Sequence, residues 1–314
     1  MPGLVPVFRK ELADHFSSKR FVILFLLVMI SGIGAAYVAA QSIRDELRTA
    51  NATSSVFLLL FTASNGNLPS FVSFIGFLGP LVGLALGFDA INGEQARGTL
   101  SRLLAQPIYR DSVINGKFLA GLTTIAVMLV CITLLAVGLG IPLVGRGPGL
   151  DDVARLVLFL AVSVVYVAFW MAAAIFFSIV FRQMATAALA GIALWIVCVF
   201  FVGMLAGQAA DLVAPVSKDP TAVELLRNDS AHRLFARVSP TRLYTEALST
   251  VMNPSKNMLG DLVLRSEVQG MVPGTLPLSQ SLLLVWPQVA GLVALTCICF
   301  AASYIRFMRQ EIRA

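Results

Sequence analysis

Long apolar runs alternate with short polar segments along this chain. Six runs contain no Asp, Glu, Lys, Arg or His, and they lie at residues 21–40, 68–88, 118–144, 156–181, 185–207 and 282–305. Each has about 20 residues or more, the length an α-helix needs to cross a hydrocarbon core about 30 Å thick. The pattern predicts an all-α polytopic membrane protein with six transmembrane helices. Residues 41–67 are predicted to be a polar connection, and residues 182–183 a very tight turn.

The composition supports a membrane protein and removes other classes. The 314 residues are 58% hydrophobic and only 13% charged, whereas soluble domains carry about 25% charged residues. The net charge of +6 is therefore assigned to residues that flank spans, and no nucleic-acid partner is expected. The first apolar run is longer than the core of a signal peptide, so it is predicted to remain as the first span.

The polar lead at residues 1–20 has a helical pattern. Phe8, Leu12 and Phe16 share one helical face, which favours a helix lying on the membrane surface over a solvated tail. With six spans and the N-terminus inside, one side of the membrane receives 12 basic and 6 acidic residues, and the other 11 of each. The positive-inside rule then makes both termini cytoplasmic.

The largest polar segment, residues 208–278, is predicted to be extracytoplasmic. It contains helical pieces at 221–226 and 241–251, and it is too apolar for a disordered linker and too short for an enzyme domain. An extracytoplasmic protein partner is a hypothesis for this segment. The predicted organisation is a cytoplasmic surface helix at 1–20, spans one to five at 21–207, the segment 208–278, and the sixth span with its tail at 279–314.

One polar stretch, residues 89–117, differs from the loops because it is predicted to form a short amphipathic helix. Leu100, Leu103 and Leu104 recur at helical spacing, and polar residues 97, 101 and 102 fall on the other side. Gly93 and Gly98 loosen the backbone before this helix, and Pro107 ends it. A polar helix tied directly to spans suits force transmission from a water-soluble partner.

The chain lacks the residues that most membrane enzymes and pumps use. It has no H-E-x-x-H or G-x-S-x-G motif, and the Gly116-Lys117 pair lacks the other residues of a phosphate-binding loop. No ionisable side chain lies in the six runs, which weighs against an ion-coupled transporter. The four cysteines lie in apolar runs and are predicted to be buried, and a membrane enzyme is disfavoured. The driving force must come from a partner.

Small residues repeat on two of the spans. Gly79, Gly83 and Gly87 recur every four positions on the second span, and Gly203 and Gly207 do so on the fifth. Such spacing lets helix backbones approach closely, although glycine is also common in spans. These five glycines are predicted to lie at a dimer interface or along a transport pathway.

The stretch 89–117 resembles the signature of type-2 ATP-binding-cassette (ABC) exporter permeases. The match has the order G-E-x-x-x-G-T-L-x-x-L-L-x-x-P-I-x-R, and Arg9-Lys10-Glu11-Leu12 resembles the N-terminal elbow helix of the same family. The resemblance implies contact with an ATP-binding subunit through an elbow, at Arg9, Lys10 and Glu11, and through a coupling helix between spans two and three. The implied coupling residues are Asp89, Gly93, Glu94, Arg97, Gly98, Thr99, Leu100, Leu103, Leu104, Pro107, Arg110 and Lys117.

The resemblance also implies how the protein works. Two copies of a permease without ATPase activity would pair with two ATP-binding subunits in the inner (plasma) membrane of a prokaryote. ATP and Mg would bind to those subunits, and this chain would hold no cofactor and no metal. The alternative is a mechanotransmitter, in which the same ATP-driven dimer moves an external protein without passing a substrate.

Two finer hypotheses stay open from the sequence. Glu94 either pairs with a basic residue or a helix N-terminus of the partner, or caps its own helix. Residues 239–244, Ser-Pro-Thr-Arg-Leu-Tyr, resemble a segment of the permeases in copper-linked transporters that mature nitrous oxide reductase. Copper contact through Met252, Met258, Met271 and His232 is conceivable because thioethers suit Cu(I), but packing is the commoner role of scattered methionines.

Overall fold

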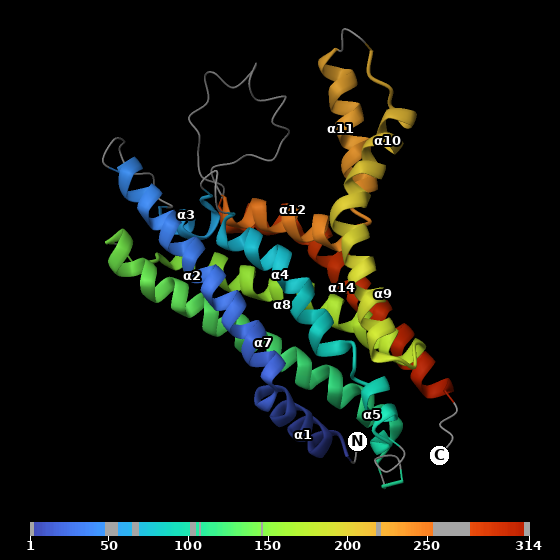
Figure 1. Cartoon of the computed structure of the whole chain (residues 1–314). Coiled ribbons are helices and arrows are strands. Elements are labelled where there is room, and N and C mark those ends of the chain that lie inside the picture. Colours follow the sequence, from blue (N-terminus) through green and yellow to red (C-terminus); the bar gives the residue numbers. More distant parts are fainter. Residues whose placement is uncertain are drawn as a thin grey trace.

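The described part of the chain is helical throughout. The computed structural model describes residues 3–47, 56–64, 69–100, 105–106, 108–145, 147–217, 221–253 and 277–310, and the regular elements within them are all helices. Six are long and apolar enough to cross a membrane, which confirms the all-α, six-span prediction (Figure 1). The spanning helices are α2 (Lys19–Leu47), α4 (Phe71–Gly87), α7 (Arg110–Val144), α8 (Leu150–Val180), α9 (Met184–Ile196) with its continuation, and α14 (Leu278–Arg309).

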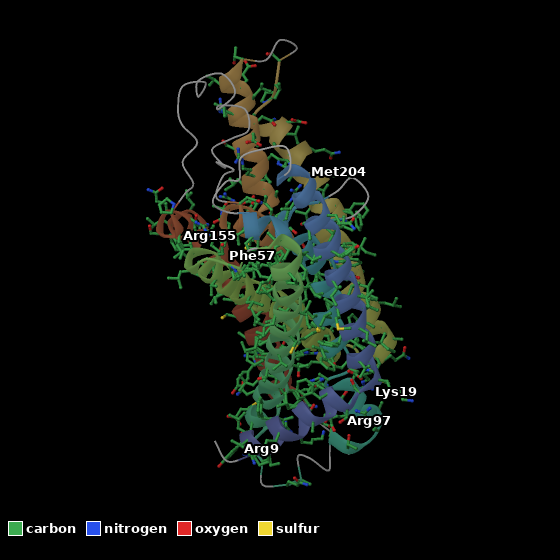
Figure 2. All side chains as sticks on the ribbon, turned by 90° about the vertical axis from the view of Figure 1, so that its left-hand side faces the viewer. Arg9, Lys19, Phe57, Arg97, Arg155 and Met204 are labelled. Atoms are coloured by element: carbon green, nitrogen blue, oxygen red, sulfur yellow. The ribbon has the colours of Figure 1, made fainter. Side chains whose placement is uncertain are left out.

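The shorter helices gather at the two ends of the bundle. The charged end, as we name it, carries α1 (Leu4–Ser17), α5 (Asn92–Ala96) and both ends of the described chain (Figure 1). The hairpin end carries α3 (Val56–Thr62), α11 (Ala222–Ala236) and α12 (Pro240–Met252). Arg9, Lys19 and Arg97 lie at the charged end and Arg155 toward the hairpin end, so charged residues lie toward both ends of the bundle (Figure 2).

Helix α8 is the centre of the bundle. It packs against α4, α7, α9, α12 and α14, and its middle segment from Tyr166 to Ile175 is buried throughout. The helix accepts so many neighbours because it is rich in alanine there, which lets other helices approach its backbone closely. The tight turn predicted at residues 182–183 is present, since α8 ends at Val180 and α9 begins at Met184.

The glycine stripe of α4 packs within the chain. A Cβ atom added at Gly83 would lie 2.5 Å from the Val167 carbonyl oxygen, and one at Gly87 would lie 2.7 Å from the Met171 carbonyl oxygen. A Cβ atom at Gly79 would instead meet the Val167 side chain, at 2.9 Å. Close backbone approach was predicted correctly, but α8 of the same chain occupies this face. It therefore does not serve as a surface for a second copy.

The predicted polar connection at 41–67 is wrong over part of its length. Helix α2 continues to Leu47, and the apolar helix α3 folds back onto the bundle. Phe57, Leu58, Leu60 and Phe61 are buried, and the Phe61 ring meets Phe71 of α4 edge-on at 5.2 Å. Seven apolar residues are too few to span a membrane, so a search for runs of about 20 residues does not find them.

The fifth span is longer and less regular than its apolar run. A π-helical turn, η1 (Val197–Phe201), joins α9 to α10 (Val202–Val213), which continues past the predicted end at 207. Helix α11 then packs back against α10, and this outer hairpin projects from the bundle (Figure 1). Helix α12 returns to the core, where most of its apolar side chains are buried against α4, α8 and α14.

The cysteines do not all lie in the core. Cys131 on α7 and Cys297 on α14 are exposed, and Cys198 and Cys299 are half-buried. The prediction that all four are buried hydrophobes is therefore wrong for the first two. Their exposed positions lie on apolar spanning helices, where a thiol facing lipid carries little cost, so an apolar run does not distinguish core from lipid.

Candidate functional site

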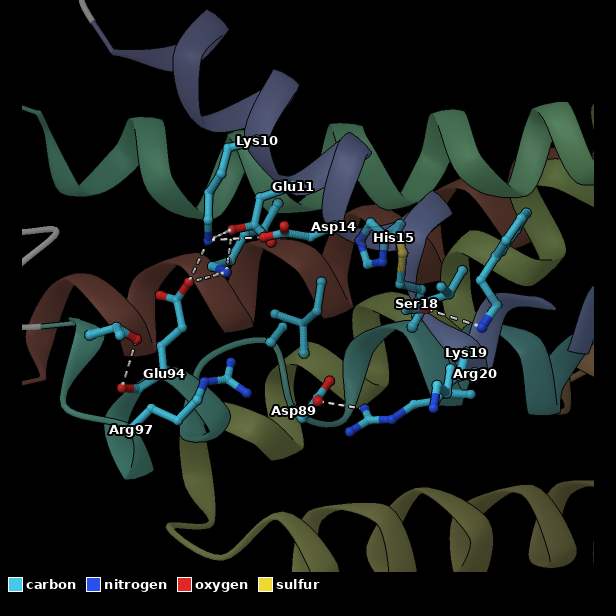
Figure 3. Close-up of a pocket in the computed structure, with 18 of the residues that line it drawn as sticks. Lys10, Glu11, Asp14, His15, Ser18, Lys19, Arg20, Asp89, Glu94 and Arg97 are labelled. Atoms are coloured by element: carbon cyan, nitrogen blue, oxygen red, sulfur yellow. Dashed lines mark hydrogen bonds and ion pairs between the residues drawn. The ribbon is translucent and has the colours of Figure 1, made fainter. Parts of the chain in front are cut away.

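A cavity of about 710 Å³ opens at the charged end between α1, the start of α2, α4, α5 and α7. Its lining includes apolar side chains, among them Leu24, Leu86 and Ile175. The lining also includes charged side chains, which we call the charged wall, and Figure 3 labels most of them. The charged wall contains both segments that the sequence pointed to, namely α1 and the stretch after α4. The cavity is therefore the candidate functional site.

Lys117 is the centre of the charged wall. Its ammonium group lies 2.9 Å from Glu11 Oε1 of α1 and 2.8 Å from Glu94 Oε1 of α5, and its side chain is only 6% exposed. Lys117 belongs to α7, so one buried cation joins three separate elements. Helix α7 begins seven residues before Lys117, whereas the predicted span begins just after it. The apolar run begins at residue 118 and so excludes Lys117, although the spanning helix α7 includes this buried cation.

Lys10 extends this cluster toward solvent. Its ammonium group lies 2.9 Å from Glu11 Oε1, 3.4 Å from Glu94 Oε1 and 3.3 Å from Asp14 Oδ2 (Figure 3). Burial alone would lower the pKa of Lys10, but the neighbouring carboxylates, chiefly Glu11, outweigh it and raise that pKa. Burial would likewise raise the pKa of Glu11, and the two lysines outweigh it, so that pKa is lowered. Lys10 and Glu11 therefore remain charged near neutral pH.

Glu94 has neither of the roles proposed from sequence. Its carboxylate is buried, and Oε1 bonds Lys117 and Lys10, so it does not reach outward to a partner. No side chain caps α5 at its start, so Glu94 does not form a capping box either. Its second oxygen, Oε2, is buried without a hydrogen-bond partner among the described residues. Glu94 is therefore an internal tie that holds α5 on α1 and α7.

Asn92 fixes α5 from its other side. The Ser178 hydroxyl of α8 accepts from the backbone N–H groups of Ile91 and Asn92 at 2.9 and 3.1 Å, and donates to Asn92 Oδ1. The Asn92 amide donates to the Phe181 carbonyl at the turn between α8 and α9. The sequence analysis did not identify Asn92 or Ser178 as site residues, although Asn92 lies inside the stretch 89–117. Helix α5 is thus anchored to α8 as well as to α1 and α7.

Asp89 and Arg20 form a second ion pair at the rim of the cavity. Arg20 Nη1 lies 2.5 Å from Asp89 Oδ2, and the guanidinium carbon lies 5.2 Å from the centre of the Phe88 ring. This pair connects the start of α2 to the end of α4. Arg97 lines the same cavity and is exposed, with no ion pair among the described residues. Among the described basic residues of the predicted contact set, Arg97 and Arg9 are exposed without an ion pair, so both are available to a partner.

The other predicted residues have structural roles or lie elsewhere. Gly98 has a φ of +65°, which glycine adopts without strain, and the Thr99 hydroxyl donates to the Glu94 carbonyl. Leu100 is buried, and Arg110 donates to the Gln310 carbonyl at the end of α14. Gly93 is buried beside Asp89. Leu103, Leu104 and Pro107 lie outside the described residues.

Helix α1 buries a different face in the protein from the one that was predicted to lie on the membrane. Val7 and Glu11 are buried against α7, whereas Phe8 and Leu12 are half-buried and Phe16 is 38% exposed. A hydrophobicity pattern cannot place a carboxylate in the buried face, because only the cation on α7 makes that burial favourable. Close packing of Val7 on Gly116 fixes α1 along α7.

The outer candidates do not form one group. Gly203 and Gly207 of α10 are half-buried, near Arg242 and His232 respectively. Met252 is buried at the end of α12, a packing position, and Met258 and Met271 lie outside the described residues. Arg155, which the sequence did not single out, is buried in α8. Its side chain bonds Asp151, the Val251 carbonyl and Ser281.

Comparison with known proteins agrees with this geometry. A family model described as ABC-2 family transporter protein matches residues 5–312, nearly the whole chain. The chain belongs to this family. Permeases of the family are membrane components, so the protein is a multi-pass membrane component of an ABC transporter.

Two curated relatives have the same printed name, probable ABC transporter permease protein NosY. The one from Pseudomonas aeruginosa is 33% identical over 119 residues, which is 38% of each chain. The one from Stutzerimonas stutzeri is 33% identical over 110 residues, which is 35% of each chain. The chain thus aligns with little more than a third of the length of either relative.

Proposed function

We propose that this chain is the permease subunit of an ATP-driven exporter, and that two copies act with two separate ATP-binding subunits. Membership of the ABC-2 family supports the partner class, because a permease of this kind takes its energy from an ATP-binding subunit. ATP and Mg would be held by that subunit. The complex would lie in the inner membrane of a prokaryote with both termini of this chain in the cytoplasm.

The buried cluster at Lys117 carries the proposal that the charged end is the coupling end. Ion pairs join α5 to α1 and α7, and the Asn92–Ser178 bonds join α5 to α8. A push on α5 or α1 from outside would therefore move two spanning helices together, because the connections are short and buried. Arg97 and Arg9 are exposed at this end and would meet acidic residues of the ATP-binding subunit.

The activity test uses the purified complex in vesicles. Glu94→Gln keeps the shape of the side chain and weakens the bonds to Lys117 and Lys10, so ATP hydrolysis should continue with transport per ATP reduced roughly tenfold. Asp111→Asn is the matched control, because it makes the same charge change in the same stretch and keeps the acceptor of the Ser112 N–H. Normal transport by a folded Glu94→Gln variant would contradict the proposal that this cluster couples ATP hydrolysis to transport.

The same vesicles decide between exporter and mechanotransmitter. Cargo that crosses the bilayer with ATP supports the exporter. ATP hydrolysis that changes only the conformation of the outer hairpin, with no cargo crossing, supports the mechanotransmitter. An extracytoplasmic partner would dock on this hairpin, where Leu212 is 85% and Val223 73% exposed.

Orientation is tested separately. Single cysteines replacing Arg97 and Ser230, which are exposed at opposite ends, should react with a membrane-impermeant reagent from the cytoplasmic and the outer side respectively. Reaction of both from one side would exclude the six-span arrangement.

A further inference from the structure

Regular α-helical bonding is interrupted by a proline in each of α4, α7 and α14, and by a π-turn in the fifth span. The interruptions in α4 and in the fifth span are the two breaks that a side-chain hydroxyl bonds. In α4, Pro80 has no N–H, so the Gly76 carbonyl lacks its usual donor four residues later. In the fifth span, η1 interrupts the α-helix with a π-turn, a feature found frequently at functional sites. Backbone acceptors inside a membrane need a partner, because no water is present to supply a donor.

A hydroxyl from a distant part of the chain bonds the break in α4 and the break in the fifth span. Tyr166 of α8 donates to the Gly76 carbonyl at 2.8 Å. Ser239 donates to the Cys198 carbonyl of η1 at 2.9 Å, and the serine is fully buried. Ser239 is at the N-cap position of α12, where serine normally bonds its own helix, but its side chain makes no such bond. Its hydroxyl is therefore used to hold the fifth span.

The two bonded breaks are joined to each other. Tyr166 Oη lies 3.2 Å from Thr241 Oγ1, which is two residues after Ser239 on the chain. The Tyr244 ring stacks on the Tyr166 ring with centroids 4.1 Å apart, and it rests on Gly76, where an added Cβ would lie 3.2 Å away. Residues 239–244, the segment that the sequence singled out, thus connect α4 to η1. Ser239 bonds η1, and Thr241 bonds Tyr166, which in turn bonds α4.

Each break controls a different part of the molecule. Helix α4 leads directly into Asp89 and α5 at the charged end. Beyond η1, α10 and α11 form the outer hairpin, and α10 packs mainly on α11 and η1 (Figure 1). A small change of angle at η1 would be amplified along this projecting hairpin.

We propose that Ser239, Thr241 and Tyr166 are positioning residues that set the angle of the outer hairpin according to the position of α4. Ser239 holds the π-turn, and Tyr166 transmits a displacement of α4 at Pro80 to the start of α12. The static part of this claim concerns the chain alone. The transmitted part rests on the proposed function, since it needs the ATP-binding subunit to move α4.

The static part is tested by amide hydrogen exchange on the full chain in lipid nanodiscs. Ser239→Ala should accelerate exchange over residues 202–236 roughly five- to tenfold, the effect of losing one hydrogen bond, and leave 184–196 unchanged. Ser239→Thr keeps a hydroxyl and should restore the slow exchange. Thr245→Ala is the control, because that hydroxyl bonds only the Thr241 carbonyl of its own helix.

Two results would overturn the static part. One is unchanged exchange over 202–236 in Ser239→Ala. The other is acceleration spread over all helices in Ser239→Ala, which would mean general destabilisation. If Ser239→Ala does not fold, Pro80→Ala gives the second test, because it supplies the Gly76 carbonyl with a helical donor and releases Tyr166. Exchange in 239–244 should be faster in that variant. No change there would equally reject the proposed connection between α4 and η1.

The transmitted part is tested in the complex with the ATP-binding subunit. Addition of ATP and Mg should change exchange over 202–236 in the wild-type complex, and Tyr166→Phe should reduce that change at least roughly threefold. Tyr37→Phe, at an exposed tyrosine of α2, should leave it intact. If ATP changes exchange over 202–236 in Tyr166→Phe as much as in the wild-type complex, Tyr166 does not transmit the displacement of α4. Absence of ATP hydrolysis in the wild-type complex rejects the proposed function instead, and the nanodisc experiment still decides the joint.

Discussion

The charged end and the hairpin end each bury basic side chains, but they satisfy them differently. At the charged end, Lys117 of α7 and Lys10 of α1 face three carboxylates, which are Glu11 and Asp14 of α1 and Glu94 of α5. At the hairpin end, Arg155 is held by Asp151 one turn away on its own helix and by neutral acceptors, the Val251 carbonyl and Ser281.

The different bonding of the basic side chains indicates which role each end can serve. A cluster with three carboxylates, two ammonium groups and a buried carboxylate oxygen, Glu94 Oε2, that has no hydrogen-bond partner among the described residues has more than one pairing available. It can exchange partners as α1 and α5 move. A guanidinium bonded to a carbonyl and a hydroxyl has directional bonds and one geometry, which suits a fixed joint between α8, α12 and α14. The following predictions test this contrast, from the largest expected effect to the smallest.

Loss of the central cation should have the largest effect. Lys117→Met leaves Glu11 and Glu94 buried without their main partner, and breaking a buried pair in this way costs about 3–5 kcal/mol. The free energy of unfolding, measured by denaturant titration of the detergent-solubilised chain, should fall by this amount. The double variant Lys117→Met with Glu94→Gln should recover part of it. A loss below about 1 kcal/mol would show that the cluster is solvated.

Arg155→Met should cost less, about 2–3 kcal/mol. It removes a charged donor from the Val251 carbonyl, whereas Asp151 is 57% exposed and keeps its hydration. The same titration measures the loss, and limited proteolysis should show earlier cleavage near the end of α12. Equal losses in Arg155→Met and Lys117→Met would contradict the contrast between the two ends.

A large residue in the glycine stripe tests packing rather than charge. Gly83→Leu should destabilise the chain by about 1–3 kcal/mol, because its side chain meets the backbone of α8 at Val167 and Met171. Self-association measured by cross-linking should not change. Gly203→Leu is the control for stability, since an added Cβ there meets only the flexible end of Arg242 at 3.3 Å. Selective loss of cross-linking in Gly83→Leu would restore the stripe as a dimer contact.

A pH titration should give the smallest effect. Burial lowers the pKa of His15 below its ordinary value of 6.5, although Glu11, Asp89 and Asp14 oppose this and Lys117 adds to it. The folded state therefore resists protonation of His15, and stability should begin to fall as the pH drops below about 6.5. His15→Gln should remove this first decrease.

A second decrease should follow at lower pH and persist in His15→Gln. The pKa of Glu11 is lowered from its ordinary value of 4.5, so its contribution is present above that pH and is lost as the pH falls through the folded value. Thermal unfolding between pH 7 and 3 resolves the two steps. A single step common to both proteins would refute the assignment to His15.

Periodicity and length were sufficient for the architecture but not for the interior. The six spans and the turn at 182–183 follow from apolar runs bounded by polar residues, because a membrane imposes one length on every span. Helix α3 escaped this reasoning because it is short. A helix was predicted at 241–251, but its burial as α12 was not, because Thr241, Arg242 and Glu246 make its sequence look like a surface helix. Both are buried by neighbours that are distant in sequence.

The candidate site shows the same division. The motif from Asp89 to Lys117 determined which stretch matters, and Asn92 and Glu94 were inside it. The partners of those residues that are distant in sequence, Ser178 for Asn92 and Lys10 for Glu94, lie 86 and 84 residues away, and no local pattern connects them. Only the packing of α1 and α8 against α7 and α5 decided that Glu94 is an internal tie, because the energy of a buried charge depends on what the fold places beside it.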